Sequence, residues 1–371
     1  MSFKFNFDLP ADEAEDGTAQ ADNDKGLTPP SDTLPDPESA ATSQTPASAH
    51  TLDELISQLP PHITYSVLEL PVSSSRTVCI PRRELFDVKM QLMAEDTMAT
   101  GNKFTAAFTN EDIRTDTYEG GLKSWECSSD LVKQLAQDDD VWRQYCRRVL
   151  ELGCGTALPT CYILQALLSP SLPSPGPVHL TLADYNIDVL RLVTLPNLLL
   201  AYAHATSYTA PPADPQGEAG TLRKEGAEDE AAAEEPNEME LTSHLISSFT
   251  STLAARNITI SFLSGCWSPT MAALHNMREG DTAEPATLLL ASETIYSPRS
   301  IVQFADVVEH TLDGAQGRGY IAAKDVYFGV GGSVADFVAL IRDKGWAWEV
   351  VREEKKGAGV GRVVMVVRKG V

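Results

Sequence analysis

The sequence lacks the features that mark zinc-binding, secreted and membrane-spanning chains. Its six cysteines include no Cys-x-x-Cys pair and no cluster with histidine, which argues against a structural zinc site and a disulfide framework. No apolar run approaches the roughly 18 residues of a membrane span, and the first residues, MSFKFNFDLPADEAED, lack the charged-then-apolar pattern of a signal peptide. We therefore expect a cytoplasmic or nuclear protein with free thiols, no bound metal and no membrane partner.

Basic residues are also scarce. The chain has 29 Lys and Arg against 52 Asp and Glu, a net charge of −23 over 371 residues. Residues 1–50 and 211–240 each hold ten acidic and two basic residues, so the rest of the chain carries only −7. Binding nucleic acid by charge takes clustered Lys and Arg, so we expect no direct nucleic-acid contact. An acidic chain favours a basic protein partner.

Two stretches show no apolar periodicity. Residues 1–50 are predicted to form a disordered acidic tail and residues 205–240 a disordered acidic insert. The FKFNF motif at 3–7 would place its three Phe on one face of a strand; an ordered edge strand, a docking motif and a loose terminus all remain open. We divide the chain into this tail, an N-terminal extension over 51–115, and a main domain over 116–371 that contains the insert.

Short apolar runs alternate with helical segments through the main domain. The alternation predicts an α/β fold, a mostly parallel sheet with helices on both faces. The runs near the chain end, AWEVVREEKK and GRVVMVVRK, predict a closing antiparallel hairpin. The five expected parallel strands are RVLELG, VHLTLADYN, ITISFLSGCW, ATLLLASETIY and GYIAAKDVYFG, and the expected helices are 157–168, 187–203, 241–256, 299–312 and 333–344.

Residues suited to binding follow four of these strands. They are Gly-Cys-Gly at 153–155, Asp-Tyr-Asn at 184–186, Gly-Cys-Trp at 265–267 and Ser-Glu at 292–293. Ligands of open α/β sheets bind outside the carboxyl ends of the strands, where a carboxylate such as Asp184 accepts hydrogen bonds from ribose hydroxyls. A dinucleotide is disfavoured, because Leu158 replaces the third glycine of G-x-G-x-x-G and Glu151 would repel a pyrophosphate. For Gly-Cys-Gly alone, a turn without a ligand remains open.

Longer motifs point to one family. ELGCGTALP followed by ADYN resembles the methyl-donor site of the class I, seven-strand S-adenosylmethionine-dependent methyltransferases. Over most of 115–350, the motifs YEGGLKSWECSSDL, DYNIDVLRLVTLPN, ASETIYSP and KDVYFGVGGSV resemble those of eukaryotic protein-histidine N-methyltransferases. The resemblance implies S-adenosyl-L-methionine as cofactor, a monomer, and as substrate a histidine in the third protein of the large ribosomal subunit.

The resemblance also implies roles for single residues. Glu293 or Asp325 would be the acceptor that fixes the tautomer of a substrate imidazole, which is mostly neutral at pH 7 because its pKa is ~6.5. The cofactor-binding residues would be Ser124, Trp125, Glu126, Cys127, Ser128, Gly153, Asp184, Tyr185, Asn186, Gly265, Cys266, Trp267 and Ser292. The substrate-binding residues would be Tyr296, Phe328, Gly329, Gly331 and Gly332, the last four in an open glycine loop.

Other interpretations remain open at this point. The residues alone allow Trp125 and Trp267 to be core packing, Glu126 to be a first-turn helix acid, and Glu293 to make a structural backbone contact. For the whole chain, a lysine-directed methyltransferase of the same superfamily shares the acid-x-x-aromatic pattern of Glu293 and Tyr296. A non-catalytic module that binds a ribosomal protein is the alternative from another class, and cofactor binding would separate it from the enzymes.

Overall fold

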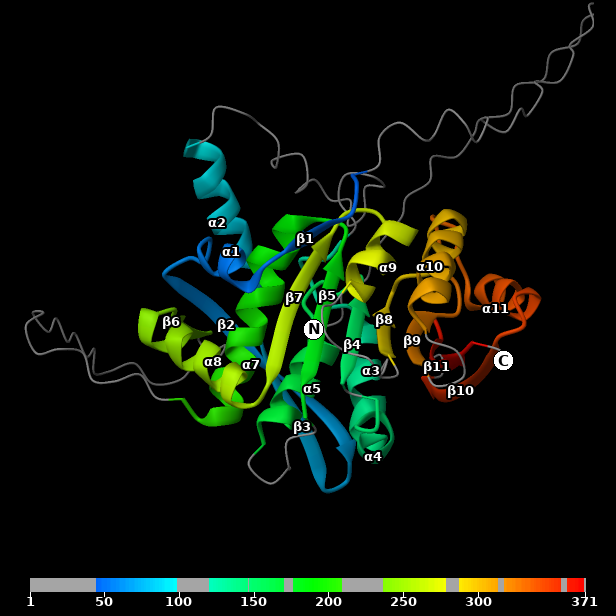
Figure 1. The fold of residues 1–371 in the computed structure, drawn as a ribbon, viewed down its shortest axis with the longest axis horizontal. Helices are drawn as coiled ribbons and strands as arrows, with labels where there is room; N and C mark the ends of the chain where they lie inside the picture. Colours follow the sequence, from blue (N-terminus) through cyan, green and yellow to red (C-terminus); the bar gives the residue numbers. More distant parts are fainter. Residues whose placement is uncertain are drawn as a thin grey trace, which may run out of the picture. The chain divides into compact units, whose positions relative to one another are not determined.

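The computed structural model describes most of the main domain and extension (Figure 1). The FKFNF motif, residues 1–44 and most of the predicted insert lie outside the described residues. Among the helices in the described part, none is long and apolar enough to cross a membrane. The described ranges are 45–98, 120–145, 147–169, 176–208, 236–277, 287–312, 317–354 and 359–369.

An eight-stranded sheet forms the centre of the fold. Five of its strands run parallel in the order β7-β5-β4-β8-β9. At one edge β11 pairs antiparallel with both β9 and β10, which confirms the predicted closing hairpin. The strands are β4 (Arg148–Leu152), β5 (Val178–Asp184), β7 (Ile258–Ser264), β8 (Thr287–Ser292), β9 (Arg318–Lys324), β10 (Ala347–Glu354) and β11 (Arg362–Arg368).

The eighth strand is one that the sequence does not predict. Strand β1 (Ser48–His50) pairs antiparallel with β7 at the other edge of the sheet (Figure 1). It lies inside the stretch 1–50 that was expected to be a disordered tail, so ordered structure begins before that boundary. Three residues are too few to show periodicity, and the strand forms because β7 offers unpaired backbone groups along its edge.

The strand order reverses between β4 and β8. From β4 the chain builds β5 and β7 on one side, and then crosses back to place β8 and β9 on the other side. Such a reversal leaves a crevice outside the carboxyl ends of the parallel strands, which is where ligands of this fold class bind.

Helices cover both faces of the sheet, as predicted. One core cluster packs α3, α5, α7 and α8 against one face, and a second packs α9, α10 and α11 against the other (Figure 1). The helix α9 was not predicted. The bounds are α3 (Glu126–Gln137), α5 (Leu158–Leu168), α7 (Leu195–Thr206), α8 (Ser243–Ala255), α9 (Pro269–Asn276), α10 (Pro298–Thr311) and α11 (Val334–Asp343), with short helices α1 (Leu52–Ile56), α4 (Asp139–Trp142) and α6 (Ile187–Val189) and the π-helical turn η2 (Leu190–Thr194).

The N-terminal extension forms a small sheet of its own with the order β3-β2-β6, followed by α2. Its last strand, β6, comes from the end of the predicted insert and pairs with the start of β2. Buried Arg83 joins this sheet to the main domain: its backbone N–H donates to Asn197 (2.7 Å) and its guanidinium to the Leu192 carbonyl (2.8 Å). The elements are β2 (His62–Ser73), β3 (Arg76–Arg83), β6 (Asn237–Glu240) and α2 (Leu85–Met98).

Strand β4 carries a buried carboxyl group at Glu151. One oxygen accepts hydrogen bonds from the backbone N–H (3.0 Å) and the hydroxyl of Thr160 in α5; the other has no hydrogen-bond partner among the described residues. Burial raises the pKa of Glu151 to about 8, although the Thr160 hydrogen bonds lower it. The carboxyl group is therefore mostly neutral at pH 7. Its hydrogen bonds to Thr160 join β4 to α5. The expectation that Glu151 would repel a bound phosphate was wrong, because this carboxyl is neutral and bonded to Thr160.

Exchange of Glu151 for glutamine should change how stability depends on pH. The unfolded carboxyl titrates near 4.5 and the folded one near 8, so the stabilisation from its proton is complete below pH 4.5 and is lost as the pH rises through about 8. Glu151→Gln stays neutral throughout. We expect the free energy of unfolding of the variant, relative to wild type, to increase by about 2–4 kcal/mol between pH 5 and pH 8.5, measured by urea denaturation. The exposed Glu238→Gln is the control, and a parallel pH dependence for Glu151→Gln and wild type would contradict the prediction.

Candidate active site

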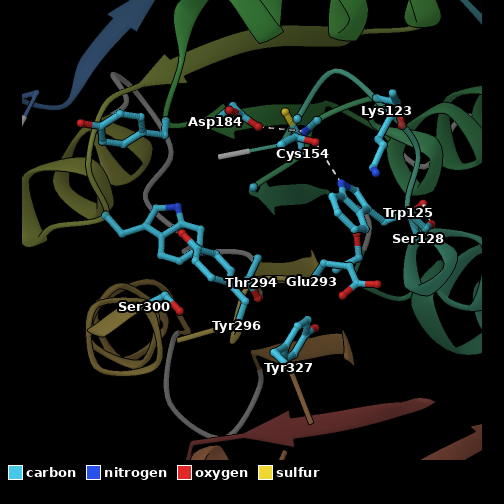
Figure 2. Close-up of a pocket in the computed structure, with 18 of the residues that line it drawn as sticks. Lys123, Trp125, Ser128, Cys154, Asp184, Glu293, Thr294, Tyr296, Ser300 and Tyr327 are labelled. Carbon is cyan, nitrogen blue, oxygen red and sulfur yellow. Dashed lines mark hydrogen bonds between the residues drawn. The ribbon is translucent and has the colours of Figure 1, made fainter. Parts of the chain in front are cut away.

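A pocket opens at the carboxyl edge of the parallel strands, on both sides of the strand reversal (Figure 2). Residues that follow all five parallel strands line it, together with the segment before α3. The lining residues are Gly120, Gly121, Lys123, Trp125, Ser128, Gly153, Cys154, Gly155, Thr156, Asp184, Tyr185, Gly265, Cys266, Trp267, Ser292, Glu293, Thr294, Tyr296, Ser300, Gln303, Lys324 and Tyr327.

Asp184 joins two of these strand ends. Its carboxylate accepts hydrogen bonds from the backbone N–H groups of Gly155 (3.0 Å) and Asn186 (3.2 Å). Gly155 has a positive φ of 51°, and a side chain there would come within 3.1 Å of the Gly121 carbonyl oxygen. The glycine thus lets the β4 turn approach the segment before α3. Burial raises the pKa of Asp184 to about 6, against the lowering effect of the backbone hydrogen bonds. This geometry suits a carboxylate that accepts hydrogen bonds from a diol.

Glu293 lies on the opposite side of the pocket from Asp184 (Figure 2). Its backbone φ is +58°, a left-handed conformation that costs a non-glycine residue about 1 kcal/mol and often marks a functional position. Its N–H donates to the Ala322 carbonyl (3.0 Å) at the end of β9, which holds the residue at the pocket wall. In the described structure, the buried oxygen Oε1 of Glu293 and the hydroxyl of Thr294 have no hydrogen-bond partner. The Thr294 hydroxyl is available to a ligand, whereas Glu293 Oε1 already has Lys324 as an ion-pair partner.

The groups around Glu293 include one cation and two protonated side chains. Lys324 Nζ lies 3.5 Å from Glu293 Oε1 and 3.2 Å from Glu126 Oε2. Burial lowers the pKa of Lys324, but the Glu293 and Glu126 carboxylates outweigh burial and raise it, so the amine stays charged. Burial, and then the Glu293 charge, raise the pKa of Cys127 and Tyr327. Glu293 therefore has one counter-ion and neutral neighbours.

The structure brings together eleven of the residues predicted for the site. Trp267 combines both interpretations left open for it, because it lines the pocket and also packs edge-on against Phe304 with ring centroids 5.7 Å apart. Trp125 lines the pocket and donates its indole N–H to the Gly120 carbonyl (2.9 Å). The eleven are Trp125, Ser128, Gly153, Asp184, Tyr185, Gly265, Cys266, Trp267, Ser292, Glu293 and Tyr296.

Four other predicted cofactor residues are not among those that line the pocket. The hydroxyl of Ser124 bonds to that of Thr156 (2.9 Å). The side chain of Glu126 is 60% exposed and pairs with Lys324. Cys127 is fully buried, and the Asn186 side chain caps α6 by accepting from the Asp188 N–H (2.9 Å). These residues support lining residues and do not themselves face the pocket.

Asp325 does not line the pocket. Its backbone N–H donates to the Gly361 carbonyl (2.8 Å), and a side chain on Gly361 would come within 2.2 Å of Asp325 Oδ2. The carboxylate thus lies against the turn between β10 and β11. Of the two acceptors that the sequence suggested, only Glu293 reaches the pocket.

The predicted glycine loop is held against the Glu293–Tyr296 segment, outside the pocket lining. A bridge between Val326 and Ser333 closes the loop, and the Gly332 N–H donates to the Tyr296 carbonyl (2.9 Å). A side chain on Gly332 would come within 2.3 Å of the Ile295 carbonyl oxygen, so the close approach requires glycine. Phe328, 81% exposed, stands on the loop next to the pocket residue Tyr327. Phe328, Gly329, Gly331 and Gly332 thus form a rim beside the site.

Sequence reasoning assigned no individual site role to half of the lining residues. Gly120, Gly121, Lys123, Thr294, Lys324 and Tyr327 stand inside the motifs used for the resemblance, and Lys324 ends the fifth parallel strand, so a signal for them existed. Ser300 and Gln303 carried none, because the face that α10 turns to the pocket depends on how it packs. The remaining ones, Cys154, Gly155 and Thr156, lie in the Gly-Cys-Gly turn and directly after it.

Comparison with known proteins identifies the family. No family model matches the chain. It is 38% identical over 290 residues to Histidine protein methyltransferase 1 of Saccharomyces cerevisiae, covering 76% of this chain and 73% of that protein. It is 36% identical over 257 residues to the Schizosaccharomyces pombe protein of the same name, covering 69% and 67%. The chain belongs to the histidine protein methyltransferase 1 family. The expected enzyme class, a protein-histidine N-methyltransferase with S-adenosyl-L-methionine as cofactor, is thereby confirmed.

Among solved structures, similar chains include other methyltransferases. A putative RNA methyltransferase from Pyrococcus horikoshii has a TM-score of 0.35 at 9% identity, covering 72% of this chain and 94% of that one. The magnesium protoporphyrin IX methyltransferase of Synechocystis with bound SAH has a TM-score of 0.34 at 8% identity, covering 76% and 100%. These scores are low, so the fold of the histidine methyltransferase rests on its own strand order.

Cofactor affinity should depend on the ionisation of Asp184. A carboxylate accepts hydrogen bonds from hydroxyl groups best when it is charged, and the Asp184 pKa of about 6 places its change of charge within the pH range of a binding experiment. We expect the affinity for S-adenosylhomocysteine to rise with pH through about 6 and to be constant above pH 7. Asp184→Asn should bind about 10- to 150-fold more weakly at pH 7.5, since a hydrogen bond to a charged group contributes about 1.5–3 kcal/mol, and should lose this pH dependence.

Isothermal titration calorimetry between pH 5 and 8 measures both effects, with the exposed Asp343→Asn as control. Equal affinity of wild type and Asp184→Asn at pH 7.5 would remove Asp184 from the cofactor site.

Proposed function

We propose that this enzyme methylates a histidine of a basic protein of the large ribosomal subunit, and that Glu293 accepts the imidazole N–H during transfer. The observation that carries the proposal is the Glu293 side chain, which lines the pocket opposite Asp184 and whose buried oxygen Oε1 has Lys324 as an ion-pair partner but no hydrogen-bond donor among the described residues. The sequence resemblance supports the third protein of the large subunit as substrate, and we place the reaction in the cytoplasm or nucleus.

The lining residues fit the cofactor. Asp184 offers a carboxylate for the two ribose hydroxyls, and Gly153, with a φ of +61°, keeps the turn after β4 free of a side chain. Trp267, which lines the pocket beside Gly265 and Cys266, offers an aromatic face for the adenine ring. S-adenosylmethionine, when bound, supplies a methyl group already activated by its positively charged sulfur. The protein therefore needs mainly to align the nucleophile and to exclude water.

Glu293 supplies the alignment in this proposal. A neutral imidazole has one N–H and one nitrogen lone pair, and an acceptor at the N–H directs the other nitrogen towards the methyl group. The new C–N bond forms as the S–C bond breaks, and the sulfur keeps the electron pair of that bond. The imidazole then carries a positive charge, and its N–H proton passes to Glu293 and on to water. Lys324 lies 3.5 Å from Glu293 Oε1 and supplies a positive charge beside the proposed acceptor.

The acidic chain suits a basic substrate. The net charge of −23 attracts a positively charged ribosomal protein over a distance of about one Debye length, ~10 Å at 0.1 M salt. Around the pocket, the exposed loop residue Phe328 and the lining residue Tyr296 offer apolar contacts for the peptide that flanks the histidine.

Mapping of the modified residue tests the proposed substrate. The full chain is incubated with S-adenosylmethionine carrying a labelled methyl group and with purified large-subunit proteins, and the label is located by mass spectrometry. We expect a single labelled histidine in one basic protein, and no labelling when that histidine is replaced. If the label is on lysine, and a substrate without histidines is modified at full rate, the enzyme is lysine-directed and the proposal is wrong.

The role of Glu293 is tested by removing its charge. Glu293→Gln can still accept the imidazole N–H but cannot take the proton. We expect kcat to fall by about 10- to 100-fold, at the lower end of general-base contributions, with the KM for the cofactor within about threefold. Wild-type kcat/KM for the peptide should rise through pH ~6.5, as a neutral imidazole requires.

Glu126→Gln is the matched control, because Glu126 pairs with the same Lys324 but is exposed. We expect its kcat to stay within about threefold of wild type. Equal losses of kcat in the two variants would mean that catalysis depends on pairing the Lys324 charge with a carboxylate. Glu293 would then have no role of its own.

A further inference from the structure

The strand β1 of the segment Thr45–His50 lies along the edge of the central sheet (Figure 1), and the segment contacts the pocket residue Cys266. Its strand β1 pairs with the last residues of β7: Ser48 is opposite Ser264 and His50 is opposite Phe262. The side chains of His50 and Ser264 share a hydrogen bond of 2.7 Å between Nε2 and Oγ. The strand pairing therefore ends where the pocket begins, at Gly265.

Residues Thr45 to Ala47 continue past β1 along the outer side of the pocket wall. The Thr45 carbonyl accepts the backbone N–H of Cys266 (2.9 Å). Gly265 has a φ of +103°, and a side chain there would come within 2.3 Å of the Pro46 carbonyl oxygen, so the two backbones are in direct contact. Ala47 packs on the same core cluster as Trp267. These contacts hold the Gly265–Trp267 turn from outside.

The segment also reaches a second strand end. The hydroxyl of Thr45 lies 3.5 Å from the phenol oxygen of Tyr185, which follows β5. Tyr185, Gly265, Cys266 and Trp267 all line the pocket, at the end where the proposed function places the adenine ring. Thr45 thus connects the two turns that border this end.

We propose that Thr45–His50 is a cofactor-positioning element, which holds the adenine end of the pocket in its binding conformation. The inference rests on the proposed function, because that function assigns this end of the pocket to the adenosine part of S-adenosylmethionine. The segment satisfies the Cys266 N–H and restrains Gly265, which without it has the wide conformational range of glycine. Without Thr45–His50, the Gly265–Trp267 turn must become ordered when the cofactor binds. The free energy of ordering the turn is then subtracted from the binding free energy, so the affinity for the cofactor falls.

Two truncations separate this segment from the tail that precedes it. Deletion of residues 2–44 keeps Thr45–His50 and should leave the affinity for S-adenosylhomocysteine within about twofold of the full chain. Deletion of residues 2–50 should lower it by tenfold or more and raise the KM for S-adenosylmethionine by a similar factor. The kcat at saturating cofactor and the KM for the peptide should stay within about threefold of the full chain. A general loss of structure would instead change both of these constants. A peptide of residues 45–51, added in trans, should restore part of the affinity.

Single substitutions decide the question if the longer truncation does not fold. His50→Ala removes the bond to Ser264 and should weaken S-adenosylhomocysteine binding by about two- to fivefold, whereas the exposed His62→Ala on β2 should not change it. The inference is overturned if deletion of 2–50 leaves the affinity unchanged, if deletion of 2–44 has the same effect as deletion of 2–50, or if His50→Ala binds like His62→Ala. Failure of the full chain to bind S-adenosylhomocysteine would instead refute the proposed function.

Discussion

The hydrogen bond from the Gly155 N–H to the Asp184 carboxylate (3.0 Å) is the contact on which the geometry of the site depends. It joins the turn after β4 to the end of β5, and the glycine at that position lets the Gly121 backbone approach to van der Waals contact. The segment before α3, which carries Trp125, is placed by this approach. A larger residue at 155, or loss of the carboxylate at 184, would separate three parts of the pocket wall at once.

The two carboxylates of the pocket have different environments, and this difference suits them to different roles. Asp184 accepts from backbone N–H groups, and burial raises its pKa to about 6, which suits hydrogen bonding to a neutral diol. Glu293 has Lys324 as counter-ion at its buried oxygen Oε1, which accepts no hydrogen bond among the described residues. Its left-handed backbone is retained although it costs stability, because the pairing of its N–H with Ala322 holds it at the end of β8. A third carboxyl, Glu151, is buried in β4 and joins this strand to α5 through Thr160.

Much of the fold could be predicted because each core element carries its own signal. The five parallel strands are short apolar runs, and helices such as α10 have apolar residues at helical spacing. Strand β1, helix α9 and strand β6 were not predicted. β1 and β6 have only three or four residues and form because a neighbouring strand offers an unpaired edge, which is a property of the assembled sheet. The boundary placed at residue 50 was therefore too late by at least three residues for the ordered chain.

The sequence by itself determined the α/β class, the family resemblance and the set of strand ends that carry the site, since these depend on residues close together in the chain. Only the tertiary structure decided which side chains face the pocket. It turned Asp325 towards Gly361 and brought Lys324 next to Glu293. It buried Cys127 and bonded the Ser124 hydroxyl to that of Thr156, so that neither residue lines the pocket. It also placed Thr45 against Cys266, residues more than 200 positions apart. The physical reason is that the direction of a side chain depends on strand register and helix phase, which are settled when the layers pack and not by local sequence.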